Sequence, residues 1–349
     1  MLLAACCGAT AQTQIGKYRP GVTPEGAVYY LPKTALRIAV QVEKTTYTPG
    51  EFAIYAGKYL RLNDTELNPS VSYRVTTLNL TSTGVADTSK CYSLKLNPKS
   101  SATNIRLSDD GTLLAINTDA RPEETPAEFV PARRPATVNP RQYMSEEILS
   151  AGSTAKMAQL TAREIYDIRE SKNQLTRGQA DFMPKDGEQM KIMLGKLEEQ
   201  DKALTSLFAG TTVKDTTEHV ITICPEKATD RQVLFRLSRK LGLVDADDLS
   251  GTPYYISITD LHSVPEPEPV ATKGKKKGPD DGVYVNVPGK IKATIYKGTA
   301  MMGNFELYAG QFGRTELLSG ELFNKRSTTR LVLNPVTGAV AKLDAEMPK

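Results

Sequence analysis

The clearest pattern of hydrophobic and polar residues lies in the middle of the chain, between Ser145 and Gly210. Apolar residues recur there at the spacing of one face of an α-helix. They are Met157, Leu160, Ile165, Ile168 and Leu175, then Met190, Met193, Leu194, Leu197, Leu204, Leu207 and Phe208. Between the two runs, Gly178 suits the position after a helix end, and Asp186 with Gln189 suits an N-cap with its partner. The pattern predicts two amphipathic helices that form a hairpin.

The regions on both sides of this hairpin alternate apolar and polar residues at every second position, as β-strands do. In residues 34–43, Leu36, Ile38, Val40 and Val42 alternate with more polar residues, which predicts a half-buried strand. Further strands are expected at 28–31, 72–80 and 92–96 and in a hairpin at 105–116, with its turn at 109–111. Residues 283–343 are again rich in β-forming residues. Regular strands and turns of this kind predict antiparallel sandwiches.

The segments between these regions complete the expected organisation. A strand at 219–224, a short helix at 231–241 closed by Gly242 and a strand at 254–258 predict a small α+β unit. Proline-rich residues 119–143 and charged residues 263–282 are expected to be linkers. The predicted class is α+β and mostly β, with two antiparallel β-sandwich-like modules flanking the helical hairpin and the α+β unit. The expected domains are 27–118, 144–262 and 283–349.

The two β regions share short stretches of similar sequence. Residues 305–310 repeat the Phe-x-x-Tyr-Ala-Gly pattern of residues 52–57, and residues 331–338 resemble residues 105–111 in the same order. The two regions are either a diverged duplication or similar by chance, because strands and turns draw on a small vocabulary. Both explanations stay open at the level of sequence.

Composition limits the function more than it defines it. The 349 residues suffice for two or three domains, and 44 Lys and Arg against 40 Asp and Glu leave a net charge of +4. So small an excess does not indicate nucleic-acid binding. The chain has no Trp and only two His, His219 and His262. Scarce histidine argues against histidine-based chemistry.

The N-terminal residues 1–11 are typical of the end of a signal peptide, with small residues at Ala9 and Ala11. The charged region that opens such a peptide is missing, which suggests a truncated signal, and cleavage after Ala11 would leave Gln12 first. Alternatively, residues 3–6 form a lipobox in which Cys6 is acylated. No other run approaches the ~18 apolar residues that span a bilayer. Both alternatives predict export, with membrane contact only through a lipid on Cys6.

Export would leave Cys91 and Cys224 as the cysteines of a chain cleaved after Ala11. They could form one disulfide in an oxidising compartment, or both could be buried free thiols, and the sequence does not decide. Neither belongs to a CxxC motif. A zinc site would have to combine them with the two scattered histidines, a spacing that no metal motif supports.

Four groups of residues suggest chemistry, and each has a simpler structural explanation. Ser153 and Lys156 match the SxxK motif of penicillin-binding proteins, and Tyr284 with Asn286 resembles the second motif of these proteins. Their third motif is absent, so Ser153 is better explained as a helix N-cap. The acidic loop of Asp245, Asp247 and Asp248 lacks the other ligands of a Ca²⁺ loop. The lysines of residues 273–277 suit a solvated tether. Tyrosines could line a carbohydrate or peptide surface, or could alternate between inward and outward positions of strands; they are Tyr29, Tyr30, Tyr254, Tyr255 and Tyr308.

Several stretches of the chain resemble an uncharacterised family of exported proteins from Bacteroides-type bacteria, a domain of unknown function. They are residues 29–33, 52–57, 165–170, 183–187 and 204–210. The resemblance spans nearly the whole chain after the N-terminal segment. It implies a location in a Gram-negative cell envelope, and it implies no activity, cofactor or catalytic residue.

The sequence as a whole favours a non-enzymatic binding or scaffolding protein of the periplasm or outer membrane, whose partner is another envelope protein or a second copy. No catalytic, cofactor-binding or metal-binding residue can be named. One alternative is an envelope hydrolase acting on glycan or peptidoglycan, which needs two carboxylates about 5–10 Å apart. A second is a surface adhesin or pilus-like module that exchanges strands at an exposed edge.

Overall fold

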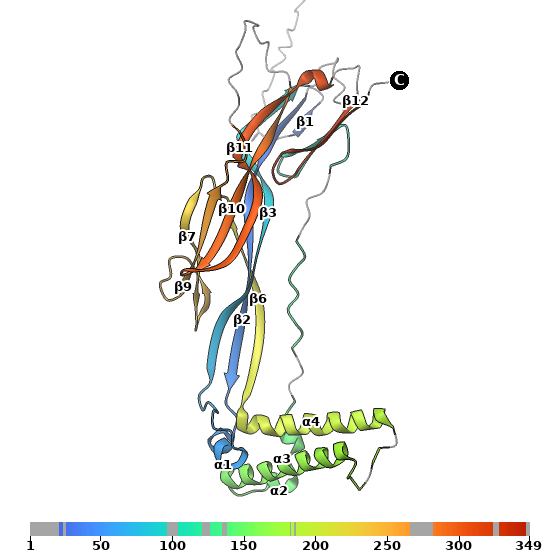
Figure 1. The fold of residues 1–349 in the computed structure, drawn as a ribbon, viewed down its shortest axis with the longest axis vertical. Helices are drawn as coiled ribbons and strands as arrows, with labels where there is room; N and C mark the ends of the chain where they lie inside the picture. The colour runs from blue at the N-terminus through green and yellow to red at the C-terminus, as the bar shows by residue number, and fades with distance from the viewer. Residues whose placement is uncertain are drawn as a thin grey trace, which may run out of the picture.

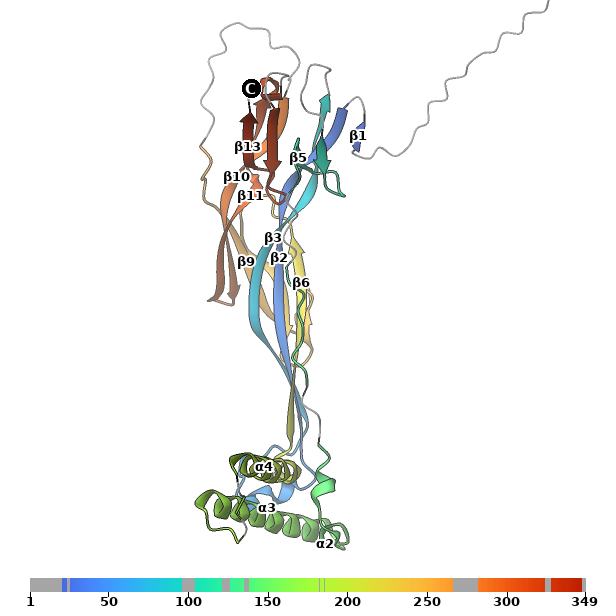
Figure 2. The same ribbon diagram turned by 90° about the vertical axis from the view of Figure 1, so that its right-hand side faces the viewer.

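The computed structural model describes residues 21–23, 26–95, 104–120, 126–134, 138–181, 183–184, 186–265, 282–323 and 328–346. The expected signal segment with Ala11 and Cys6, the lysines of residues 273–277 and most of the second linker lie outside these residues. The molecule is elongated (Figure 1). A shaft of long strands carries a layer of helices across one end, and the last described strands, β12 (Thr328–Leu333) and β13 (Val340–Glu346), lie near the other end (Figure 2).

The shaft is built on the longest alternating segment of the sequence. Strand β2 (Gly26–Thr48) pairs antiparallel with β3 (Ser70–Lys95) along almost its whole length, from Gly26 opposite Lys95 to Tyr47 opposite Ser70. The other edge of β2 pairs with β1 (Gly21–Thr23) and with β6 (Thr211–Ile223). The strand predicted at 34–43 is therefore confirmed, as the middle of a much longer one.

A second sheet packs face to face against the middle of the shaft. Its strand order is β11-β10-β9-β7-β8, with β7 at Thr229–Ser238, β8 at Gly242–Val244, β9 at Thr252–Asp260, β10 at Gly282–Lys297 and β11 at Ala300–Ser319. The two sheets enclose the first hydrophobic core. It includes Leu36, Ile38, Val40 and Val42 of β2 and Ile291, Ala293 and Ile295 of β10.

The helix expected at residues 231–241 is wrong, because this segment forms β7. Leu234, Phe235 and Leu237 are buried in the first core, with a register shift of the β7–β9 pairing between Val233 and Phe235. Gly242, taken as a helix end, has φ of +85° and lies where β7 turns into β8. The small unit after Gly210 is therefore made of strands.

A third sheet joins the two ends of the sequence. Its order is β13-β12-β5-β4, with β4 at Ile105–Leu107, β5 at Leu113–Ile116, β12 at Thr328–Leu333 and β13 at Val340–Glu346. The hairpin predicted at 105–116 is confirmed, with Gly111 at φ of +83° in its turn. Leu331 of β12 pairs with Ile116 of β5, so the predicted N-terminal and C-terminal β regions share one sheet. This sheet and the starts of β2 and β10 enclose a second core.

The helical layer contains the predicted hairpin. Helix α3 (Thr154–Arg177) and helix α4 (Gly187–Ala209) confirm it, and the short helices α1 (Ala56–Leu60) and α2 (Glu146–Leu149) complete the layer with the 3-10 helices η1 (Ala53–Tyr55) and η2 (Pro140–Tyr143). A further 3-10 helix, η3 (Gly320–Phe323), follows β11 at the other end of the molecule. We call the layer of α1–α4, η1 and η2 the head. Figure 2 shows that it lies across the tip of the shaft. The expected α+β, mostly β class is confirmed.

The similarities between the two β regions have different outcomes. Residues 52–57 form a turn and the start of α1, whereas residues 305–310 lie within β11, so this pair has no common structure. Residues 105–111 and 331–338 both belong to short hairpins of the third sheet. Each short hairpin also follows a long one, β2–β3 or β10–β11.

Candidate functional site

The head has its own core, which holds it to the tip of the shaft. Phe52 lies in the turn four residues after the end of β2, is fully buried and packs on Phe208 of α4, with 5.4 Å between the ring centroids. The Phe52 amide also donates a hydrogen bond of 2.7 Å to the carbonyl of Leu207. At the edge of the head, Arg141 of η2 forms an ion pair of 3.1 Å with Glu51. The head is therefore attached at several points around the end of β2.

Local capping signals position the two long helices. Ser153 accepts a hydrogen bond from the Lys156 amide at the start of α3, and Asp186 accepts one of 2.7 Å from the Gln189 amide at the start of α4. Gly178 ends α3 with φ of +71°, a conformation that favours glycine. Ser153 and Lys156, the two residues of the SxxK match, thus belong to a helix cap.

A polar cluster links the helices to each other. The Arg169 guanidinium of α3 donates hydrogen bonds of 3.1 and 3.2 Å to the Asp201 carboxylate of α4 and a third of 3.2 Å to Thr205. The two bonds to Asp201 share the Arg169 Nε donor, and Nη2 lies 3.0 Å from one of the same carboxylate oxygens, so the ion pair is held by more than one nitrogen. This cluster sets how the two helices lie against each other.

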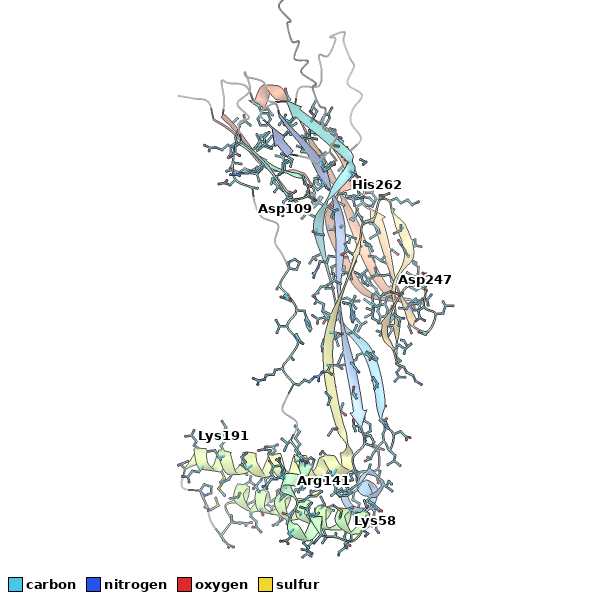
Figure 3. All side chains as sticks on the ribbon, turned by 180° about the vertical axis from the view of Figure 1, so that it is seen from behind. Lys58, Asp109, Arg141, Lys191, Asp247 and His262 are labelled. Atoms are coloured by element: carbon cyan, nitrogen blue, oxygen red, sulfur yellow. The ribbon has the colours of Figure 1, made fainter. Side chains whose placement is uncertain are left out.

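The projecting half of α4 is less well covered than the half above the shaft. The buried residues of this helix, Ala203, Leu204, Leu207 and Phe208, all lie in its C-terminal half. Toward the N-terminus its apolar residues are only half-buried, and Ile192 is 62% exposed. Figure 3 labels Lys191 in this projecting half, far from the shaft. The half-buried apolar residues from Met190 to Leu197 therefore form a stripe of about two turns on one face of the helix, and Ile192 lies on the opposite, exposed face.

The neck between the first core and the head is a three-stranded ribbon braced by charges. Glu43 of β2 receives a hydrogen bond of 2.8 Å from Arg74 of β3 and lies 3.8 Å from Lys214 of β6. The hydrogen bond from Arg74 is the main reason that the pKa of Glu43 is lower than usual. One carboxylate thus connects all three strands of the neck.

A buried polar joint lies where the two long hairpins cross. Asn286 of β10 is 1% exposed, and its amide nitrogen donates hydrogen bonds of 2.9 Å to the carbonyls of Pro32 and Thr337. Beside it, the Gln311 side chain both accepts from the Thr34 amide and donates to the Thr34 carbonyl, each at 2.8 Å. The joint therefore ties β2, β10, β11 and the β12–β13 turn together between the two sandwich cores.

The structure does not bring the penicillin-binding motif residues together. Ser153 lies in the head, whereas Tyr284 and Asn286 lie on β10 near the opposite end (Figure 1). Tyr284 stacks on Tyr92 at 4.3 Å, and its amide donates to the hydroxyl of buried Tyr29 at 2.8 Å. The Tyr29 hydroxyl donates in turn to the Tyr284 carbonyl at 3.3 Å, and burial raises the pKa of Tyr29.

The other candidate residues are dispersed. Asp247 lies in the loop before β9, away from the head (Figure 3), and neighbouring Asp248 accepts a hydrogen bond of 2.9 Å from the Ser250 amide. Cys91 and Cys224 are both free, and burial raises the pKa of the Cys224 thiol. Among the described residues, no group of three or more His, Cys, Asp or Glu side chains is placed to hold a metal ion.

The tyrosine pairs follow the alternation of strands. Tyr29 and Tyr254 are each 1% exposed, whereas their neighbours Tyr30 and Tyr255 are half-buried on the opposite faces. Tyr308 is 54% exposed on β11. Each neighbouring pair thus contributes one core residue and one outward residue.

Two further findings concern the whole chain. Within the described residues, no helix combines the length and apolar character needed to cross a bilayer. A family model described as a domain of unknown function (DUF4831) matches residues 25–341. No curated protein and no solved structure matches the chain.

Proposed function

The chain belongs to the DUF4831 family of unknown function, and from this premise we propose that it is an exported, non-enzymatic protein of the cell envelope. In this proposal it binds or scaffolds a partner through its head. The family match covers residues 25–341, which include the head, the shaft and both sandwich cores. The proposed function therefore concerns the head, the shaft and both sandwich cores together.

The observation that carries the proposal is the separation of the head from the chain ends. Strand β2 has 23 residues, which at about 3.3 Å per residue spans roughly 75 Å. Strand β1, the first described segment, pairs with the end of β2 that is remote from the head. A lipid on Cys6 would attach the molecule at that remote end, and the head would then reach away from the membrane. Such a shape suits a spacer that presents a binding surface.

The projecting surface of α4 supports the head as the binding end. The incompletely covered methionines on one face of α4 and the exposed isoleucine on the other leave apolar helical surface for a partner helix to contact. The residues that suggested catalysis have structural roles, since Ser153 caps α3 and Asn286 belongs to the buried joint. The partner is another envelope protein or a second copy of the chain, in a Bacteroides-type periplasm or at the inner face of its outer membrane.

A crosslinked pull-down of the tagged protein from its own cell envelope tests the proposal. We expect the wild type to recover one partner in stoichiometric amount and Ile192→Glu to lose it. Leu241→Glu is the matched control, because Leu241 is 64% exposed but lies beside the second sheet. Recovery of the protein alone or with glycan fragments would refute the scaffolding role. Equal recovery of the partner by both variants would show that the head is not the binding surface. Cell fractionation, with the mass of the mature N-terminus, tests export.

A further inference from the structure

We propose that the outer face of the second sheet binds carboxylate-bearing saccharides, with Arg231 as the group that receives the carboxylate. This face is formed by the side chains of β9, β10 and β11 that point away from the first core. It is distant from the head, so the inference goes beyond the proposed function and does not depend on it.

Arg231 is held in place over this face. It lies at an irregularity of β7, between the paired residues Thr229 and Gln232, and has φ of +49°, a backbone conformation that residues other than glycine rarely adopt. Its guanidinium carbon lies 5.2 Å from the ring centroid of Tyr255 and 5.5 Å from that of Tyr296. The Arg231 guanidinium also donates a hydrogen bond to the Gly298 carbonyl. The side chain is therefore stacked across two strands before any ligand arrives.

A small hydrogen-bond network fixes the backbone of this irregularity. The Arg231 amide donates a bond of 2.9 Å to the Ser257 hydroxyl, which in turn donates one of 3.0 Å to the Asp230 carboxylate. The carboxylate next to Arg231 in sequence is thus occupied by Ser257. Binding would then require little ordering of the arginine, which favours affinity.

The positive charge at this place has no acidic partner. Among the described residues, Arg231 has no carboxylate oxygen within the 4.0 Å of an ion pair. Lys297, which precedes the glycine that Arg231 contacts, lies on the other face of the sheet, where its ammonium nitrogen is 5.9 Å from the ring centroid of the core residue Tyr254. A stacked guanidinium with donors left over is suited to a carboxylate, which it can bind through two parallel bonds.

Short and long side chains are arranged in rows across the three strands. The strand pairing places a row of short polar residues between two rows of longer ones. The rows are Tyr255, Tyr296 and Met301, then Ser257, Thr294 and Asn304, then Thr259, Lys292 and Glu306. Neighbouring rows lie about 7 Å apart, which is two residues along a strand. Lys290 and Tyr308 continue the face by one more row.

This arrangement matches the chemistry of an acidic sugar polymer. Ser257 and Thr294 of the middle row are buried, so the exposed side chains of Asn304 and Thr259 are the ones that can bond to sugar hydroxyls. Met301 and Tyr308, 63% and 54% exposed, offer apolar surface to sugar C–H groups. Lys290 is paired with Glu306 at 2.6 Å, which leaves Lys292 as the lysine of this face that can receive a second carboxylate. An extended peptide would favour the edge of a sheet, where backbone groups are available, over a face that offers side chains only.

Calorimetric titration of the full-length protein with tetragalacturonate tests the inference, with maltotetraose and tetraglutamate as neutral and peptide comparisons. We expect tetragalacturonate to bind and the other two to bind at least tenfold more weakly. Arg231→Gln should weaken binding by about tenfold or more, because it removes charged hydrogen bonds. Arg239→Gln is the matched control; it is an exposed arginine of the turn after β7 and should change affinity by less than about twofold.

Lys292→Gln guards against misfolding of the Arg231 variant, since Lys292 lies on the outer face in a separate row, and it should weaken binding severalfold with an unchanged circular dichroism spectrum. The inference is overturned if the wild type does not bind tetragalacturonate, if maltotetraose or tetraglutamate binds equally well, or if the Arg231 and Arg239 variants behave alike. The head variant Ile192→Glu should bind tetragalacturonate like the wild type. Loss of the partner protein and loss of saccharide binding are therefore distinguishable.

Discussion

Replacement of Asn286 by alanine should destabilise the whole molecule, because its side chain joins the two long hairpins. The substitution removes two hydrogen bonds of 2.9 Å and leaves the carbonyls of Pro32 and Thr337 without that donor. Each buried carbonyl left unpaired costs about 1–3 kcal/mol, and the void admits some water, so we expect a loss of ~3 kcal/mol in the free energy of unfolding. The hydrogen bond of 3.0 Å from the Asn286 amide to the Gly338 carbonyl remains in the variant.

Urea unfolding followed by far-ultraviolet circular dichroism measures this loss, since the chain has no Trp to report by fluorescence. The control is Asn79→Ala, an exposed asparagine of β3, which should change the free energy of unfolding by no more than about 0.5 kcal/mol. A loss below about 1 kcal/mol for Asn286→Ala, or one equal to that of the control, would refute the argument that this joint holds the hairpins together.

Three further substitutions test the head, the neck and the packing of the shaft. Phe52→Ala removes a fully buried ring and should cost about 3–5 kcal/mol, with hydrogen exchange rising in the head before the sandwiches; uniform exchange would contradict a separate head core. Glu43→Gln should lower the urea midpoint at pH 7, because a carboxyl whose folded pKa lies below 4.5 stabilises the fold above that pH. The difference in midpoint between variant and wild type should vanish as the pH falls through the folded pKa of Glu43. A difference that stays constant with pH would exclude the hydrogen bond from Arg74 as its cause. Gly84→Ala would place a Cβ 2.1 Å from a carbonyl oxygen of the β12–β13 turn and should destabilise the fold by about 1–3 kcal/mol. Gly195→Ala, whose Cβ meets nothing within 4 Å in α4, should stabilise the fold by about 1 kcal/mol. Thermal melts in which both variants shift in the same direction would contradict the packing described.

The helical hairpin could be predicted because its signals are local. Helical spacing, the caps at Ser153 and Asp186 and the glycine at 178 all lie within the segment that they organise. The strand at 34–43 was predictable for the same reason, since one face of β2 is buried and the other is less so. Local patterns of this kind do not need the rest of the chain to be interpreted.

The pairing of distant strands could not be predicted, because alternation shows that a strand exists and not which strand it pairs with. Leu331 and Ile116 are neighbours in the third sheet although 215 residues separate them. For this reason two separate sandwich modules were expected where the structure interleaves both ends of the chain. The error at β7 arose because Gly242 suits a helix end and a tight turn equally well.

The positions of the two polar residues Asn286 and Arg231 could not be predicted from the sequence either. Asn286 follows buried Val285, so alternation places it on an outward face, yet it is buried because the hairpins cross there. Arg231 was assigned to a helix, where its position over Tyr255 and Tyr296 cannot arise. The available signal was the Val-Leu-Phe-Arg-Leu sequence from Val233, whose first, third and fifth residues fit one face of a strand.

The most direct test of the central claim is site-specific photo-crosslinking in living cells, with a photoreactive amino acid placed at position 192 or at position 241. A head that binds a partner predicts one discrete crosslinked product from position 192 and none of that mass from position 241. The same product from both positions, or none from position 192 in a protein that is exported and folded, would contradict the claim that the head is the binding end.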